Sequence, residues 1–144
     1  SLPYVLGVTT VIFGKHIDKI QVDKAKNIHT LPVVIGEKAA RYAVIAMMVL
    51  PYFFTGYLIV TKFFTPIMLI VLLAIPALRE SLPPLTKPKP DTRPEGFPDG
   101  QGGWPLYFAP IAFRNNRSFG SLFMLGLLLD VALRLLPFTQ NFWR

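Results

Sequence analysis

The segment 42-YAVIAMMVLPYFFTGYLIVT-61 contains no charged residue in twenty positions, and this property sets the class of the whole chain. At about 1.5 Å per residue, a helix of this length crosses the hydrocarbon core of a bilayer. A second charge-free run covers 63–78, and a third covers 118–133 with only Asp130 inside it. The sequence therefore predicts membrane helices at 37–61, 63–80 and 118–136.

The composition agrees with a membrane protein. Of the 144 residues, 52% are hydrophobic and 16% are charged, whereas a soluble domain has about 25% charged residues. The absence of cysteine excludes disulfides and thiolate metal sites. A net charge of +7 would suggest nucleic acid as the partner of a soluble protein. Here the excess of lysine and arginine is explained by loops on the cytoplasmic side of a membrane, so the expected partner is a lipid bilayer and not nucleic acid.

The apolar segment 2–14 starts without an initiator methionine or a charged flank. We interpret it as the inner half of a helix that begins further upstream and continues to Lys24, so that 1–24 is a helix end. The expected fold is an all-α transmembrane bundle of about three membrane helices plus the end of a fourth. The chain is then a single membrane domain, 1–144, and the C-terminal part of a larger membrane protein.

Basic residues alternate along the chain and predict its orientation. They surround the first and third connections but not the second, where Lys62 stands alone. The first group is Lys15, Lys19, Lys24, Lys26, Lys38 and Arg41, and the third is Arg79, Lys87, Lys89, Arg93, Arg114 and Arg117. The Pro/Gly-rich segment 81–103 is expected to be an extended loop on the cytoplasmic side, interpreted as a mobile linker with a lid or docking arm as the alternative. Trp143 is expected on the far side, and Ser118 is expected to start the last helix.

The segment 15-KHIDKIQVDKAKNIHTLPVVIG-36 places ionisable residues at the end of one apolar segment and before the next. Such residues are costly near a bilayer and mark a functional site by default. Asp18 and Asp23 are five positions apart and point about 140° away from each other on a helix, at about 100° per residue. They are therefore not a pair, and Asp23 shares its face with His16, Lys19 and Ile20.

This segment resembles the UbiA-type intramembrane prenyltransferases. In that family, a helix with a D-x-x-x-D motif is followed by a short basic loop and then by T-L-P-V-x-x-G. Asp23, Lys24, the run 30–33 and Gly36 match the pattern, whereas Lys19 stands in the place of the first acid. The resemblance covers about the first 36 residues by motif and the remainder only by helix count and order. The D-x-x-x-D motif is the second acidic motif of the family, and the first, which lies between earlier helices, is absent from this chain.

The resemblance implies a larger nine-helix fold with a cavity open to lipid, in the inner (cytoplasmic) membrane. It implies transfer of a polyprenyl group from an isoprenyl diphosphate to a lipophilic acceptor, such as an aromatic quinone precursor, a pigment or a lipid. Asp23 would bind Mg²⁺ and, with Lys19, would be catalytic, while Lys24, Lys26 and His16 would contact substrate. Carboxylates hold Mg²⁺ while phosphates fill other positions, and the metal stabilises the leaving diphosphate.

Other interpretations remain open. The charged helix end can be a solvated surface, His16 can be an interfacial polar residue, and 30–32 are expected to shape the loop. A non-catalytic membrane subunit of prenyltransferase-like fold within a larger complex is the main alternative, because Lys19 replaces an acid. A channel or transporter fragment rests only on Asp130, which we expect to form a structural pair with Arg134 one turn later.

Overall fold

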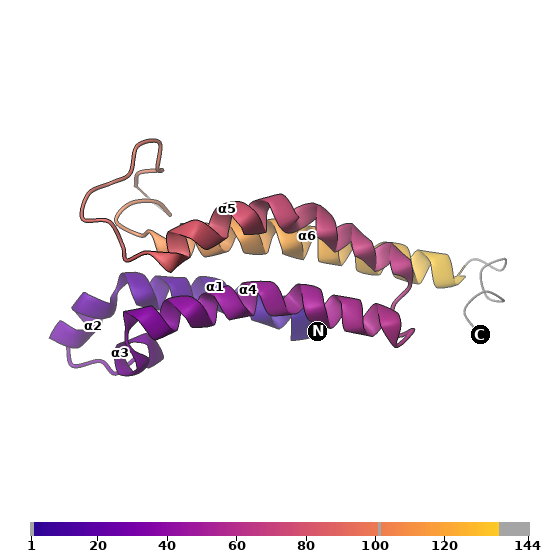
Figure 1. The fold of residues 1–144 in the computed structure, drawn as a ribbon, viewed down its shortest axis with the longest axis horizontal. Coiled ribbons are helices and arrows are strands. Elements are labelled where there is room, and N and C mark those ends of the chain that lie inside the picture. The colour runs from indigo at the N-terminus through magenta and orange to yellow at the C-terminus, as the bar shows by residue number, and fades with distance from the viewer. Residues whose placement is uncertain (1, 101, 136–144) are drawn as a thin grey trace.

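The computed structural model describes residues 2–100 and 102–135. It contains six α-helices and one 3₁₀ helix in this part of the chain: α1 Leu2–Asp18, α2 Ile20–Ala25, α3 Leu31–Ile35, α4 Glu37–Val60, η1 Pro66–Ala74, α5 Ile75–Thr86 and α6 Phe108–Leu135. Figure 1 shows an elongated bundle in which α4 lies beside α1 and the continuous η1–α5 rod lies beside α6. The expected all-α class is confirmed for the described residues.

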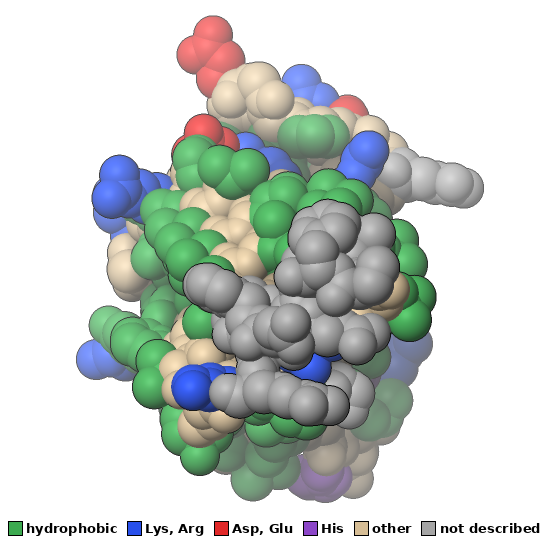
Figure 2. All heavy atoms as spheres, turned by 90° about the vertical axis from the view of Figure 1, so that its right-hand side faces the viewer, with side chains coloured by type: hydrophobic (Ala, Val, Ile, Leu, Met, Phe, Trp, Pro, Cys, Tyr) green, Lys and Arg blue, Asp and Glu red, His purple; other side chains and the backbone are tan. Residues whose placement is uncertain are grey.

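Three helices in the described part of the chain are long and apolar enough to cross a membrane: Glu37–Val60, Pro66–Thr86 and Phe108–Leu135. Large hydrophobic side chains remain exposed along all three, among them Phe53, Tyr57, Val60, Leu73, Leu128 and Val131. Figure 2 looks along the bundle from one end and shows hydrophobic side chains over much of the described surface that faces the viewer. An apolar surface of this extent suits a lipid environment.

The buried core has two parts. Near the α1–α2 end, Ile17, Val44 and Phe108 belong to one cluster from three different helices. Towards the opposite end, Met68 and Phe123 belong to the second cluster, between η1 and α6. The first cluster packs α6 against α1 and α4, and the second packs it against η1.

The expected single helix over 3–24 is divided in the structure. α1 ends at Asp18, and α2 begins at Ile20, with Lys19 between them at φ −105° and ψ 4°. The helical hydrogen bonding resumes when the Asp23 N–H donates to the Lys19 carbonyl at 2.8 Å. Asp18 lies before this break and contacts the start of α6, whereas Asp23 lies after it and contacts Thr30.

The last helix starts at Phe108 and not near Ser118, so this expectation is wrong. Pro110 lies in the first turn of α6, where its missing N–H removes no helical bond. The first N–H groups of this turn donate to the carboxylate of Asp18, which acts as a cap from another helix. Ser118 lies inside the helix and donates from Oγ to the Arg114 carbonyl at 3.1 Å.

The second membrane segment begins at Pro66 as the 3₁₀ helix η1 and continues as α5. Its buried residues Met68, Val71 and Ala74 recur every three positions, which matches the three residues per turn of this helix. A Cβ atom on Gly126 of α6 would meet the Met68 sulfur at 2.8 Å. The absence of a side chain at this glycine therefore lets η1 approach α6.

The Pro/Gly-rich segment differs from its expected extended form in its first residues, because α5 continues to Thr86. The Arg41 guanidinium donates to the Leu85 carbonyl at 3.1 Å and so satisfies one free carbonyl of the helix end. The remainder is irregular but bonded: Arg93 pairs with Asp99 at 2.8 Å, and the Trp104 N–H donates to the Pro98 carbonyl at 2.8 Å.

The connections are arranged as the charge pattern predicts. The α2–α3 corner and the Pro/Gly-rich segment lie at one end of the bundle, and the turn between α4 and η1 lies at the other (Figure 1). At the latter end, Asp130 accepts from the Thr65 N–H at 2.6 Å and from Arg134 Nε at 3.0 Å. The expected structural role of Asp130 agrees with these contacts, while Trp143 lies outside the described residues.

Candidate functional site

Asp23 lies at the junction of α1, α2 and the following connection. Only 8% of this residue is exposed. Its Oδ2 atom lies 3.4 Å from Thr30 Oγ1, which donates to it, and 3.8 Å from His16 Nδ1. The Asp23 carbonyl also accepts from the Ile28 N–H at 2.8 Å. One carboxylate therefore joins the end of the first helical segment to the T-L-P-V-x-x-G motif.

The motif residues shape the backbone that brings Thr30 to Asp23. Asn27 turns the chain after α2 with φ 56°, a conformation that asparagine tolerates better than most residues. Thr30 is extended, Pro32 lies in the first turn of α3, and Gly36 ends this helix at φ 85°. The expectation that 30–32 shape the loop agrees with this geometry, and the contact of Thr30 with the carboxylate is an addition to it.

His16 is the second group at this junction. Its Nδ1 atom is buried and has no hydrogen-bond partner among the described residues, although Asp23 Oδ2 lies 3.8 Å away. A buried imidazole nitrogen without a partner is unusual, because polar atoms lose free energy when they leave water unpaired. A ligand oxygen near Asp23 would supply the missing partner.

The three lysines predicted to bind an anion lie near the junction, but no ion pair in the described part of the chain holds their side chains there. Lys19, Lys24 and Lys26 are exposed, and the structure gives none of them an ion pair within the described residues. An ion pair between Lys19 and Asp23, which their shared helix face would have allowed, is therefore not among the contacts of the described residues. Ammonium groups on flexible stems can reach a bound anion as point charges.

Asp18 has a role that its sequence position did not reveal. Its buried carboxylate accepts from the backbone N–H groups of Tyr107, Phe108 and Ala109 at 2.9, 3.1 and 3.0 Å. Lys89 Nζ lies 4.0 Å away. Burial raises the pKa of the Asp18 carboxyl above its usual value, while these N–H groups and the Lys89 ammonium act in the opposite direction. Asp18 is occupied by structural contacts and is not part of the Asp23 junction.

The described residues contain no group of three or more His, Cys, Asp or Glu side chains placed to hold a metal ion. Mg²⁺ does not require such a cage, since one or two carboxylates with substrate phosphates and water are sufficient. Asp23 supplies one carboxylate of the oxygen type that Mg²⁺ prefers. The single carboxylate of Asp23 therefore fits a Mg²⁺ ion whose other ligands are phosphate oxygens and water.

Comparison of the chain with protein-family models, curated proteins and solved structures finds no match. Function is therefore inferred from the groups that meet at Asp23 and from the motif that positions them.

Proposed function

We propose that this chain is part of a Mg²⁺-dependent membrane prenyltransferase of the UbiA type. The enzyme would transfer a polyprenyl group from an isoprenyl diphosphate to a lipophilic acceptor. The observation that supports the proposal most is the contact between Asp23 and Thr30. It joins the acid of the helix to the T-L-P-V-x-x-G motif, so that the two halves of the resemblance form one site.

The residues around Asp23 have complementary roles in this proposal. Asp23 would hold Mg²⁺ together with the diphosphate, and the ion would offset the negative charge that grows on the leaving group. Lys19, Lys24 and Lys26 would meet the diphosphate oxygens from the aqueous side as point charges. His16 would donate or accept through its unpartnered Nδ1 atom.

Besides a site for the diphosphate, such an enzyme needs an apolar path for the prenyl chain, which the bundle would provide. Three membrane-length helices lie behind the junction and expose large hydrophobic side chains. The first acidic motif of such an enzyme, and the remainder of a nine-helix fold, would come from an upstream region. The positive-inside tendency supports a cytoplasmic position for the α2–α3 corner, and the inner-membrane location rests on the resemblance alone.

Purified full-length protein in detergent tests the proposal directly. We expect prenyl transfer from a radiolabelled isoprenyl diphosphate to be lost when EDTA removes divalent ions and to return when Mg²⁺ is added. Transfer that persists in EDTA would contradict the role given to Mg²⁺. No transfer from diphosphates of any chain length to any aromatic or lipid acceptor would contradict the proposed activity itself.

A non-catalytic membrane subunit is the second candidate, and one observation favours it. Asp18 is fully engaged with α6, so the helix end offers only the carboxylate of Asp23. Intact mass and N-terminal sequencing of the native protein discriminate between the two. An upstream region with the first acidic motif of the family supports the enzyme, whereas a native chain without that motif supports the subunit.

A further inference from the structure

A groove lies along α6 beside its contact with η1, on the side of the bundle. Its cavity volume is about 510 Å³, and its lining combines two arginines and two serines with two leucines: Arg114, Arg117, Ser118, Ser121, Leu73 and Leu122. All but Leu73 lie on α6, where residues three and four apart share a face. The groove therefore has two guanidinium groups along one wall and apolar side chains beside them.

Arg117 is the charge in this groove that lacks a counter-ion. It lies within α6, a helix of membrane-spanning length, and the structure shows no ion pair for it within the described residues. Arg114 pairs with Glu80 at 3.2 Å, but both side chains are more than half exposed, which makes the pair weak. An arginine at the edge of a bilayer is stabilised by an anion, and guanidinium groups recognise phosphate by paired hydrogen bonds.

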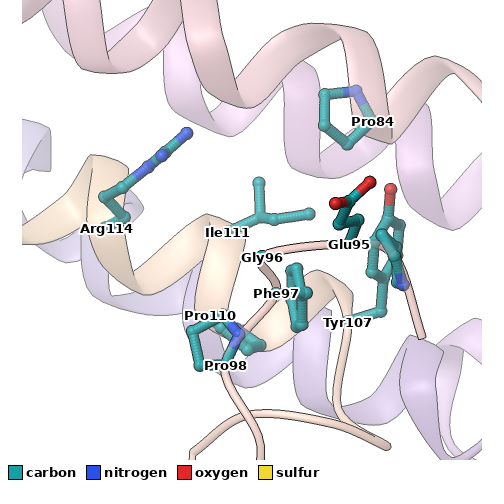
Figure 3. A pocket seen from close by; sticks show the side chains of 10 residues that line it. Pro84, Glu95, Gly96, Phe97, Pro98, Tyr107, Pro110, Ile111 and Arg114 are labelled. Carbon is teal, nitrogen blue, oxygen red and sulfur yellow. The ribbon is translucent and has the colours of Figure 1, made fainter.

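Arg114 also lines a second pocket of about 310 Å³ on the side of the Pro/Gly-rich segment. Figure 3 shows Arg114 on one side of this pocket and Glu95 with Tyr107 on the other, with Phe97 between them. The Phe97 and Tyr107 rings lie 5.3 Å apart. Glu95 is exposed and has no ion pair within the described residues. A carboxylate beside aromatic rings is the chemistry that recognises an organic ammonium group.

We propose that the two cavities together bind one phospholipid whose headgroup carries an ammonium group. Arg114 and Arg117 hold the phosphate, with Ser118 and Ser121 beside it. The ammonium group lies against Glu95, Phe97 and Tyr107. An acyl chain follows Leu73 and Leu122 into the apolar part of the bundle.

The groove favours a lipid over free phosphate for two reasons. Leu73 and Leu122 line the same cavity as the arginines, and a free ion would leave them against water. Leu73 is also 70% exposed, on a helix that is long and apolar enough to cross a membrane. The inference does not depend on the proposed prenyl transfer.

Native mass spectrometry of the full-length protein in detergent tests the inference. The probes are phosphatidylcholine, phosphatidylglycerol, which has the phosphate but no ammonium group, and diacylglycerol, which has neither. We expect phosphatidylcholine to bind more tightly than phosphatidylglycerol and diacylglycerol not to bind. Arg117→Gln should weaken both phospholipids about tenfold or more, as expected for loss of a hydrogen bond from a charged group. Glu95→Gln should remove the preference for phosphatidylcholine.

Arg79→Gln is the matched control, because Arg79 is an exposed arginine of α5 that lines neither cavity. It should bind phosphatidylcholine as the wild type does. Equal or tighter binding of phosphatidylglycerol would overturn the headgroup assignment. Unchanged binding in Arg117→Gln, or displacement of lipid by millimolar inorganic phosphate, would overturn the site.

Discussion

Asp18, at the end of α1, accepts a hydrogen bond from the backbone N–H of Phe108 at 3.1 Å, across 90 positions of sequence. The same carboxylate accepts from the N–H groups on either side of Phe108. A carboxylate is favoured at a helix N-terminus because the free N–H groups carry partial positive charge. This contact fixes the end of α1 against the start of α6 and thus the point from which α2 leads to Asp23.

Removal of this carboxylate should destabilise the bundle. Asp18→Ala leaves three backbone donors of the 107–109 segment without their acceptor and Lys89 without its nearest acid. Since an unsatisfied buried donor costs about 1–3 kcal/mol, we expect a loss of at least this size in the free energy of unfolding. Thermal unfolding in detergent measures it.

Asp91→Ala is the control for this prediction, because Asp91 lies exposed in the Pro/Gly-rich segment. Its unfolding temperature should equal that of the wild type. An Asp18→Ala protein that unfolds at the same temperature as this control would show that Asp18 does not cap α6.

Two glycines should respond in opposite directions to the same substitution. A Cβ atom on Gly14 would meet the Phe108 carbonyl oxygen at 2.9 Å and the Ala109 nitrogen at 3.0 Å, and a Cβ atom on Gly56 would meet nothing within 4 Å. We expect Gly14→Ala to destabilise by about 1–3 kcal/mol, since backbone atoms must move. Gly56→Ala should stabilise by about 0.5–1 kcal/mol, because alanine favours the helix. Equal unfolding temperatures for the two variants would contradict the close approach of α1 and α6.

Asp18 should also give the stability a dependence on pH. Its pKa is raised in the folded protein, so the folded state binds the proton more tightly than the unfolded state, whose value is about 3.9. The contribution is fully present below the unfolded pKa and is lost as the pH rises through the folded pKa. The unfolding temperature of wild type, relative to Asp18→Asn, should therefore fall as the pH increases from 4. A difference that grows with pH would show that the hydrogen bonds and Lys89 outweigh burial.

The membrane helices could be predicted from the sequence because their signal is local. A charge-free run such as 42–61 is incompatible with water over its whole length, whatever its neighbours are. α4 was therefore predicted within one residue at its C-terminal end. The Asp23–Thr30 contact was not predicted, although a short connection joins the two residues.

The start of α6 and the role of Asp18 could not be predicted in this way. Both depend on a contact across 90 positions, and no local pattern records it. Pro110 gives no sign that a helix has ended, because it lies in the first turn of α6, where proline is tolerated. The sequence feature that could have indicated this contact is Asp18 itself. Its carboxylate does not lie on the helix face of Asp23 and therefore needed a partner elsewhere.

The arrangement of the connections makes a prediction about topology. Single cysteines at His29, Thr61 and Thr92 occupy exposed positions in a chain that has no cysteine of its own. A membrane-impermeant maleimide should label positions 29 and 92 from the same side of the membrane and position 61 from the other. Labelling of all three from one side would contradict the membrane-spanning role of α4.

The proposed role of Asp23 in prenyl transfer can be tested by the turnover of the full-length Asp23→Asn protein. Asparagine keeps the size of the side chain and an oxygen for Thr30 but removes the negative charge. Asp91→Asn, in an exposed segment, is the matched control. At saturating Mg²⁺ and isoprenyl diphosphate, we expect turnover to fall about 10²–10³-fold in Asp23→Asn and to stay at the wild-type value in the control. Equal turnover in the two variants would contradict a role of Asp23 in the reaction.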